Sequence, residues 1–469
     1  MNRSLATERP DSLDSLFALA QSMAGGDAIR DGIVRDIYQT SRNICREAVR
    51  YEDPKKLEST YRLDKIVTSP IWGFPIMLAI LGVVFWITIA GANVPSGMLA
   101  DMFGVIEGYL TAAFQAVHAP DWLHGLLVLG LFRGTAWVVS VMLPPMAIFF
   151  PIFALLENFG YLPRVAFNMD RLFKKAGGHG KQALTMSMGF GCNAAAIIST
   201  RIIESPRERM IAILTNNFVP CNGRWPTLIL LASLFVAAGV ASQYHTLVTA
   251  LIVMGMVLIG IVVTLSVSWI LSKTALRGVP THYTLELPPY RKPQMLKTVL
   301  LASKDKSLSV LTRAVVVAAP AGVITWILGN VTVGGDSILN HLASVFQPFA
   351  HTLGLDGYIL MAFLLGLPAN EIVLPILLMG YLSSGAMVDT DGMDNIKDIF
   401  LAHGWTWLTA LNMMLFSLLH YPCGTTLINI YKETKSVKWT VLSALIPLSI
   451  AVAVTFVIAQ TARALGWVA

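Results

Sequence analysis

The chain begins with a polar segment, residues 1–66, and becomes strongly apolar near Trp72. Within the polar segment, isoleucines at 29, 33, 37 and 44 recur at helical spacing and predict an amphipathic helix over 27–50. We expect this helix to lie on the cytosolic side and to pack on the apolar part of the protein. The run from Pro70 to Ala92 is long enough to span about 30 Å of hydrocarbon.

Further apolar stretches follow, and several contain proline or glycine where a simple spanning helix would not. They lie at about 122–157, 225–243, 246–272, 308–331, 355–385, 403–421 and 438–465. The interruptions are VMLPPMAIFFP (141–151), MGFGCNAAA (188–196), GLPANEIVLP (366–375) and HYPCGTT (420–426). Broken helices survive in a membrane only where protein or a wet cavity surrounds them. The pattern predicts an all-α, polytopic membrane protein whose functional site lies where the breaks converge.

The composition agrees with this fold class. Of the 469 residues, 55% are hydrophobic and 13% are charged. Soluble domains carry about 25% charged residues, so this chain has too few to cover a soluble globule of its size. The same arithmetic excludes disordered and collagen-like chains, and four cysteines in a chain this long do not indicate a disulfide framework. We recognise no removable signal peptide after Met1.

The net charge of +6 fits the positive-inside rule better than binding to nucleic acid. Lys and Arg concentrate in 162–181, 273–306 and 431–438, whereas 93–121, 333–354 and 386–396 have none. We therefore expect a multi-pass protein of the cell inner membrane, with the basic segments and the N-terminus in the cytoplasm.

Two parts of the chain carry the same pair of short sequence motifs. GFGCNA (189–194) precedes VPCNGRWPTLI (219–229), and GLPANE (366–371) precedes YPCGTTLINI (421–430). The match predicts two related gate repeats, and the charge map favours their insertion from opposite sides, with a site at the midplane between them. The alternative is a chance match of short patterns. The predicted divisions are 1–66, 67–121 (first spanning helix and external amphipathic segment), 122–245 (first repeat), 246–306, 307–437 (second repeat) and 438–469 (last spanning helix).

Three of the four cysteines fall at these breaks: Cys192, Cys221 and Cys423. A single buried cysteine is usually an apolar filler, but three at breaks favour a path for a soft or borderline metal ion. Asn193 and Asn370 add amide groups where main-chain partners have been lost. Supporting roles are expected for the residues that create the breaks, namely Gly189, Gly191, Pro220 and Pro422.

Ionisable residues near these breaks are functional candidates, because burying a charge in a membrane is costly. Glu371 follows the second Gly-x-x-x-Asn element, and Glu157 ends an apolar run. The alternative for each is a structural ion pair: Glu157 with Arg164, and Glu371 with Arg133 or Arg224. His420 precedes the Tyr-Pro-Cys break and is either a ligand or a hydrogen-bonded core histidine.

Residues 155–226, which run from LLENFGYLPR to FVPCNGRWP, resemble the first gate region of the ferrous-iron transport protein B family (FeoB). The similarity continues through DKIVTSPIWGFPI (64–76), GLPANEIVLPIL (366–377) and LLHYPCGTTLINIYKETKSVKW (418–439), and residues 27–63 look like the family's linking helix. The resemblance implies Fe(2+) as the transported substrate. It also implies metal-pathway roles for Cys192, Asn193, Cys221 and Cys423, a gate role for Glu371, and a structural or gating role for Glu157.

The chain departs from the family at two residues and in one motif. Asn370 stands where the family usually has Lys, and Asn158 where it usually has Asp. The phosphate loop G-x-x-x-x-G-K-[ST] of the family's GTP-binding domain does not occur; GGHGKQ (177–182) lacks the required spacing. We therefore expect no nucleotide site and no enzymatic activity. Either a separate small GTPase docks on residues 1–66, or the protein works without nucleotide.

The leading hypothesis is inward transport of ferrous iron or a related first-row metal, with the divalent ion and the lipid bilayer as partners. Phe190, Trp225, Asn193 and Asn370 leave open a nucleoside or other organic solute transporter. A third possibility is a non-transporting membrane scaffold. A homo-oligomer is compatible with each, and none requires nucleic acid.

Overall fold

The structure is a computed structural model that describes residues 26–48, 54–69, 71–236, 242–278, 290, 294–383, 385–387 and 396–467. The chain divides into two units, Met1–Arg62 and Leu63–Ala469. The first unit contains α2 (Gly26–Ala48) and most of α3 (Pro54–Val67). The predicted N-terminal helix is thus confirmed, and its packing on the rest of the protein stays a prediction.

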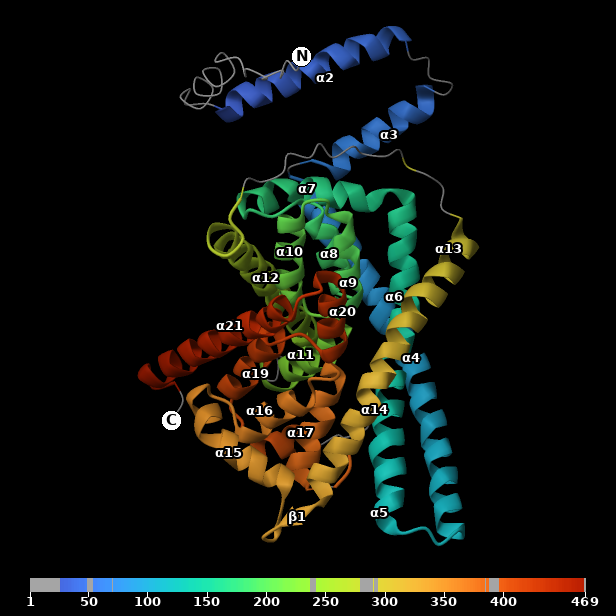
Figure 1. Ribbon diagram of the computed structural model, residues 1–469, viewed down its shortest axis with the longest axis vertical. Coiled ribbons are helices and arrows are strands. Elements are labelled where there is room, and N and C mark those ends of the chain that lie inside the picture. Colours follow the sequence, from blue (N-terminus) through green and yellow to red (C-terminus); the bar gives the residue numbers. More distant parts are fainter. Residues whose placement is uncertain are drawn as a thin grey trace, which may run out of the picture. The chain divides into compact units, whose positions relative to one another are not determined.

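The second unit is a helical membrane domain, as predicted (Figure 1). Among the described residues, four helical segments are long and apolar enough to cross a membrane. Two bent pairs would raise this number to six: α15 (Ile338–Thr352) with α16 (Gly357–Leu365), bent by 114°, and α18 (Ile396–Ala402) with Trp407–Thr434, bent by 108°. The four segments are α4 (Gly73–Ala116), Asp121–Phe159, α12 (Ser242–Lys273, apolar from Leu247) and α21 (Val437–Ala464).

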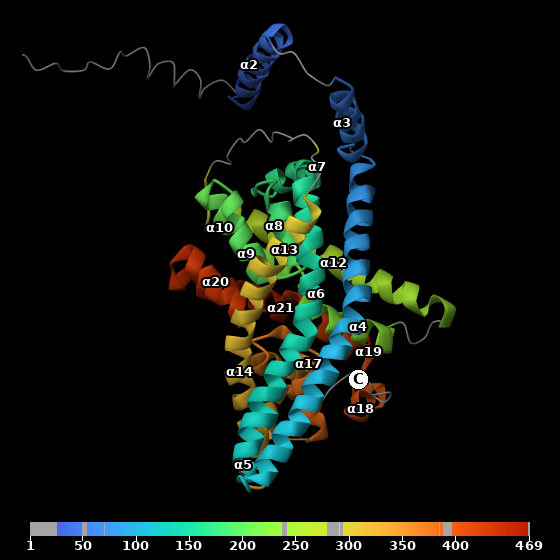
Figure 2. The same cartoon turned by 90° about the vertical axis from the view of Figure 1, so that its right-hand side faces the viewer.

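The first spanning helix does not end near Ala92. Helix α4 continues through Pro95 to Ala116 and so takes in most of the predicted external segment. It runs beside the Asp121–Phe159 segment, which consists of α5 (Asp121–His124), η1 (Gly125–Phe132) and α6 (Arg133–Phe159) (Figures 1 and 2). On the far side of that segment, Gly130 and Gly134 pack against Gly322, because residues without a side chain allow helix backbones to approach closely.

Each gate repeat contains two broken elements, at the places that the sequence predicts. In the first repeat α8 (Gln182–Gly189) is separated from α9 (Asn193–Ser199), and α10 (Pro206–Thr215) from α11 (Trp225–Leu231). Short 3-10 turns lie around these breaks: η2 (Thr200–Ile202), η3 (Asn216–Phe218) and η4 (Asn222–Arg224). The amphipathic helix α7 (Tyr161–Lys175) precedes these breaks, and η5 (Ala232–Val236) follows them.

The second repeat has the same plan. Helix α16 is separated from α17 (Val373–Leu382) by a turn that includes η8 (Asn370–Ile372), and α19 (Trp407–Leu419) from α20 (Gly424–Thr434) by the Tyr-Pro-Cys segment. Before them come α13 (Met295–Ala302), η7 (Ser303–Leu308) and α14 (Ser309–Asn330). A small hairpin of β1 (Thr332–Val333) and β2 (Asp336–Ser337) pairs Thr332 with Ser337.

The two repeats approach the middle of the domain from opposite ends. In Figure 1, α8, α9 and α10 lie in the half that carries α7, whereas α15, α16 and α17 lie in the half that carries β1. Helices α11 and α20 continue past the second break of their own repeat into the other half. This placement agrees with the predicted inverted arrangement and brings the four breaks to one level.

Candidate functional site

The four breaks surround one small cavity of about 30 Å³. All six residues that were predicted as the metal pathway line it: Cys192, Asn193, Cys221, Asn370, Glu371 and Cys423. On the same measure of cavity volume, one water molecule needs roughly 10–15 Å³. The cavity therefore has space for a single small ion. Residues that are 231 positions apart in the sequence, from 192 to 423, thus meet at the centre of the membrane domain.

Main-chain hydrogen bonds hold the two breaks of each repeat together. In the first repeat the Asn222 N–H donates to the Gly191 carbonyl at 3.2 Å, and in the second the Gly424 N–H donates to the Leu367 carbonyl at 2.7 Å. The donor is the residue after the Pro-Cys dipeptide in both cases. The acceptor lies inside the Gly-x-x-x-Asn element in both cases, as its third residue (Gly191) and its second residue (Leu367) respectively. The similar pairing of the two breaks supports the repeat.

All three cysteines of the breaks line the cavity, each from a different break. Cys192 and Cys221 are buried, and Cys423 is half-buried with its Sγ 3.2 Å from Thr426 Oγ1. Asn370 directs its Nδ2 toward the Cys221 thiol at 3.9 Å, and its Oδ1 is buried without a hydrogen-bond partner. An unpaired buried carbonyl oxygen is costly, so this atom is suited to accept a cation.

The acidic and thiol side chains do not form a closed metal site on their own. Among the described residues, no three His, Cys, Asp or Glu side chains are placed so that they could hold one ion together. An ion in this cavity would therefore need amide or main-chain oxygens as well, or a closer approach of the side chains.

Glu371 lies against Gly223, which belongs to the other repeat. A Cβ atom at Gly223 would overlap the Glu371 carboxylate, so glycine is required there for the carboxylate to reach the cavity wall. One predicted ion pair is wrong, because the Arg133 guanidinium binds Glu107, with Nε 3.1 and 3.0 Å from the two carboxylate oxygens.

The other predicted partner, Arg224, uses its guanidinium mainly on carbonyl oxygens. The side chain is 1% exposed, and its hydrogen bonds fix the end of α19 to the first repeat. Its acceptors are the carbonyls of Asn217 (2.8 Å), Leu418 (2.9 Å), Tyr421 (3.2 Å) and His420 (3.3 Å), and Asn217 Oδ1 (3.2 Å). The last carbonyls of a helix carry partial negative charge, so a cation is stabilising there. Arg224 is thus a cross-link between the repeats.

His420 is a core histidine and does not line the cavity. Its Nδ1 lies 3.0 Å from the Phe416 carbonyl and 2.9 Å from the Ser417 carbonyl, so Nδ1 carries the proton and donates it. Of its two predicted roles, the structure supports the hydrogen-bonded one.

Glu157 is exposed near the end of α6 and is absent from the cavity wall. Its predicted pairing with Arg164 is wrong, because the buried Arg164 guanidinium donates to both carboxylate oxygens of Asp64, at 2.9 and 3.0 Å. Gly191 has no room for a side chain, since a Cβ there would overlap the Phe149 ring.

Buried asparagines that the sequence analysis passed over complete the surroundings. Asn216 donates to Asn193 Oδ1 at 3.3 Å, and its own Oδ1 is buried without a partner. Asn429 donates to the Ala194 carbonyl at 2.9 Å and so joins α20 to α9. Asn217 donates to the His420 carbonyl at 2.5 Å. The one sequence signal was the run TNNF (215–218) inside an apolar region.

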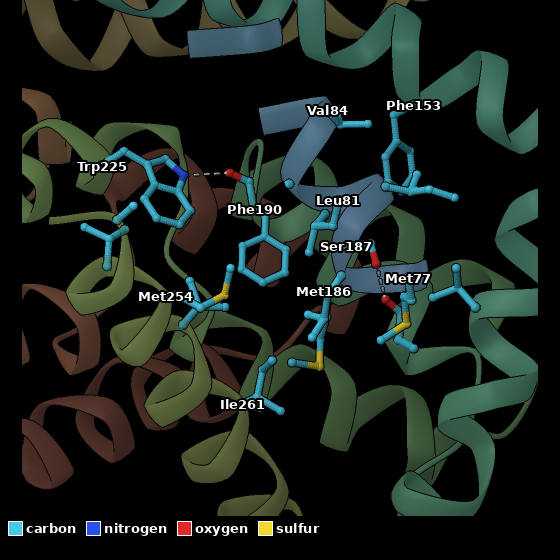
Figure 3. Close-up of a pocket in the computed structure, with 18 of the residues that line it drawn as sticks. Met77, Leu81, Val84, Phe153, Met186, Ser187, Phe190, Trp225, Met254 and Ile261 are labelled. Carbon is cyan, nitrogen blue, oxygen red and sulfur yellow. Dashed lines mark hydrogen bonds between the residues drawn. The ribbon is translucent and has the colours of Figure 1, made fainter. Parts of the chain in front are cut away.

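The residues considered for a nucleoside site do not come together. Phe190 and Trp225 stack with ring centroids 6.5 Å apart and line a separate cavity of about 510 Å³ (Figure 3). Asn193 and Asn370 line the small cavity instead. The amide groups that would hydrogen-bond a base therefore line a different cavity from the aromatic rings that would stack on it.

Two models of known protein families match this chain. The family model described as "Gate: Nucleoside recognition" matches residues 139–235 and 311–437, which lie within the two predicted repeats. The model described as "Ferrous iron transport protein B C terminus" matches residues 253–306.

Similar proteins match almost the whole chain. The Fe(2+) transporter FeoB of Staphylococcus aureus (strain COL) is 29% identical over 465 residues, which cover 97% of this chain and 67% of the relative. Proteins of the same name from Synechocystis sp. (29% identical, 89% and 66% covered) and Methanocaldococcus jannaschii (27% identical, 91% and 62% covered) are similar too. The chain thus spans about two thirds of these relatives or slightly less. The paired gate matches, the C-terminal match and the similarity over nearly the whole chain show that it belongs to the FeoB family, of which it carries the membrane portion.

Proposed function

We propose that the protein moves Fe(2+) across the membrane through the small cavity between the two gate repeats. Relatives named Fe(2+) transporter FeoB support the substrate. The observation that carries the route is the convergence of three thiols, one carboxylate and two amides, from all four helix breaks, on one cavity.

The chemistry of these side chains suits a borderline metal. Thiolate and amide groups together favour iron or a neighbouring first-row ion, whereas calcium and magnesium prefer sites made of oxygen alone. Because no three acidic, thiol or imidazole groups of the described residues already form a site, we infer that an arriving ion gathers the cavity side chains and so draws the broken helices inward. A site that binds weakly before it closes also releases its ion, which transport requires.

The direction we propose is inward. The basic segment around α7 and the segment that carries α13 lie at one end of the membrane domain, and α5 and β1 lie at the other (Figure 1). By the positive-inside rule the α7 end faces the cytoplasm. A separate GTPase that docks on residues 1–66 is compatible with this orientation and is part of the proposal.

Metal binding and uptake test the proposal. Cobalt(II) added to purified protein should give the sulfur charge-transfer absorption of thiolate ligation, and Fe(2+) uptake into proteoliposomes should be measurable. Both should fall at least tenfold in a variant with Cys192, Cys221 and Cys423 changed to Ser. The matched control is Cys45→Ser, because Cys45 is exposed on α2.

Two results would contradict the proposal. Unchanged uptake in the triple variant would remove the thiols from the route and favour an organic solute. A well-folded wild-type protein that neither binds cobalt nor takes up iron would favour a scaffold.

A further inference from the structure

An apolar cavity of about 510 Å³, partly open to the surface, lies beside the first repeat in the described part of the membrane domain. Its walls come from five helices, α4, α7, α8, α11 and α12, with contributions from the end of α6. Figure 3 shows side chains that project into it, among them Met77, Leu81, Met186, Met254 and Ile261. The volume is within the roughly 300–1,000 Å³ of small-molecule sites.

Apart from Tyr161, the polar side chains that line it are already paired with main-chain carbonyls. Ser187 donates to Ala183 at 2.8 Å, Thr249 to His245 at 2.9 Å, Ser233 to Leu230 at 2.8 Å, and Trp225 to Phe190 at 3.4 Å. A nucleoside or a hydrated ion needs free donors and acceptors, and these groups have little to offer. The cavity is therefore suited to an apolar occupant.

The cavity borders the surface that faces the lipid. Helices α4 and α12, which form two of its walls, are spanning helices. In the most apolar stretch of these helices only 19% and 28% of the residues, respectively, are buried, so most of each stretch faces outward. Met254 both lines the cavity and is 41% exposed. Hydrocarbon chains of the bilayer thus lie at its mouth.

Helix α7 lines the cavity with one face and carries basic residues on the other. Its inner face, with Val165, Met169 and Phe173, lines the cavity. The opposite face carries Arg171 and Lys175, both exposed. A helix with a basic outer face and an apolar inner face is suited to the membrane interface and attracts anionic lipid headgroups.

We propose that this cavity binds an acyl chain of an anionic phospholipid, which enters between α4 and α12 while its headgroup stays near Arg171 and Lys175. The chain then packs against Phe190 and Trp225, which lie next to the break residues Gly191 and Arg224. The lipid would support the first repeat from behind, on the side away from the small cavity.

Photolabelling of the full-length protein tests this site. The probe is phosphatidylglycerol with a diazirine near the end of one acyl chain, diluted into phosphatidylethanolamine vesicles that contain the protein. We expect labelled peptides from α8 and from the inner face of α12, around Met186 and Ile261. The variants Ala183→Phe, inside the cavity, and Ala250→Phe, on its wall, should lower this labelling at least fivefold. Val457→Phe on the exposed face of α21 should leave it unchanged.

The outcomes separate the parts of the proposal. Label confined to the outer faces of α4 and α12 in the wild-type protein would overturn it, whether or not the filled variants fold. A phosphatidylethanolamine probe that labels α8 as strongly as phosphatidylglycerol would overturn the role of the anionic headgroup. If Arg171→Gln with Lys175→Gln removes the preference for phosphatidylglycerol but keeps the acyl label, both parts are supported.

Discussion

The Arg201 guanidinium donates to the Glu433 carboxylate at 2.6 and 3.0 Å and so joins the first gate repeat to the end of the second. Arg209 reaches the same carboxylate at 2.5 Å, and the Glu433 side chain is only 5% exposed. Helices α9 and α20 begin at the central breaks, and this ion pair lies at their far ends. It therefore joins the two repeats on the α7 side of the small cavity.

We expect Glu433→Gln to loosen this end. A hydrogen bond to a charged group contributes about 1.5–3 kcal/mol, so the free energy of unfolding should fall by about 2 kcal/mol. Maleimide should also modify Cys423 faster in the variant than in the wild-type protein, because α20 is less firmly held. Glu58→Gln is the control, since Glu58 pairs with Arg62 at the surface and such pairs contribute little. Equal modification rates would mean that the ion pair does not restrict access to the cavity.

Arg224→Gln should destabilise the protein strongly. The substitution removes a buried cation and leaves several carbonyl oxygens of α19 and Asn217 without donors, each costing about 1–3 kcal/mol. Arg224→Lys keeps the charge but lacks the planar set of donors, so it should recover only part of the stability. Thermal unfolding in detergent measures both, and Arg62→Lys at an exposed position provides the control. A wild-type unfolding temperature for Arg224→Gln would contradict the role of Arg224 as a cross-link.

Stability should depend on pH through His179, in the segment between α7 and α8. Burial lowers the pKa of His179 from its ordinary 6.5; Lys181 and Lys174 lower it further, and Glu208 and Asp170 oppose them. Its Nδ1 accepts the Lys181 N–H at 3.0 Å, which requires the neutral ring. The unfolded chain therefore binds the proton more readily, so stability present above pH 6.5 is lost as the pH falls toward the folded-state pKa.

The measurement is the unfolding temperature at pH 7.5 and 5.5, and we expect a smaller difference between them in His179→Gln. The matched control is His341→Gln, at an exposed position on α15. An unchanged pH dependence in His179→Gln would assign the effect to other groups.

Much of the fold could be predicted because its signals are local. Glycine and proline mark the four breaks, and Lys and Arg mark one end of the domain. The six cavity residues could be predicted for the same reason, since cysteine, asparagine and glutamate fall directly at those breaks.

The partners of the charged residues could not be predicted, because they come from distant parts of the chain. Asp64 and Arg164 are 100 residues apart, and Arg201 and Glu433 are 232 apart. The predicted pair of Glu157 with Arg164 relied on closeness in sequence and was wrong for that reason. Position 223 also depends on a distant residue, because glycine there leaves room for the side chain of Glu371.

Gly223→Ala tests whether the position of the Glu371 carboxylate matters. The added methyl would overlap the carboxylate and push it from the cavity wall, so we expect cobalt binding to weaken at least tenfold with little loss of folded protein. Gly255→Ala in α12 is the control, because its Cβ would meet no atom within 4 Å and alanine favours a helix by up to about 1 kcal/mol. Unchanged cobalt affinity in Gly223→Ala would show that the ion does not need this carboxylate position.

The charge of Glu371 is the last feature to test. If the transported ion is its counter-ion, Glu371→Gln should keep the packing of η8 but lower Fe(2+) uptake at least tenfold, about 1.4 kcal/mol of lost interaction. Asn370→Lys places an ammonium beside the same carboxylate, where it should compete with the ion and lower uptake too. Glu157→Gln is the matched control, since Glu157 is exposed at the end of α6 and away from the cavity. Uptake into proteoliposomes at equal protein incorporation measures all three. Wild-type uptake in Glu371→Gln would leave the carboxylate with a structural role only.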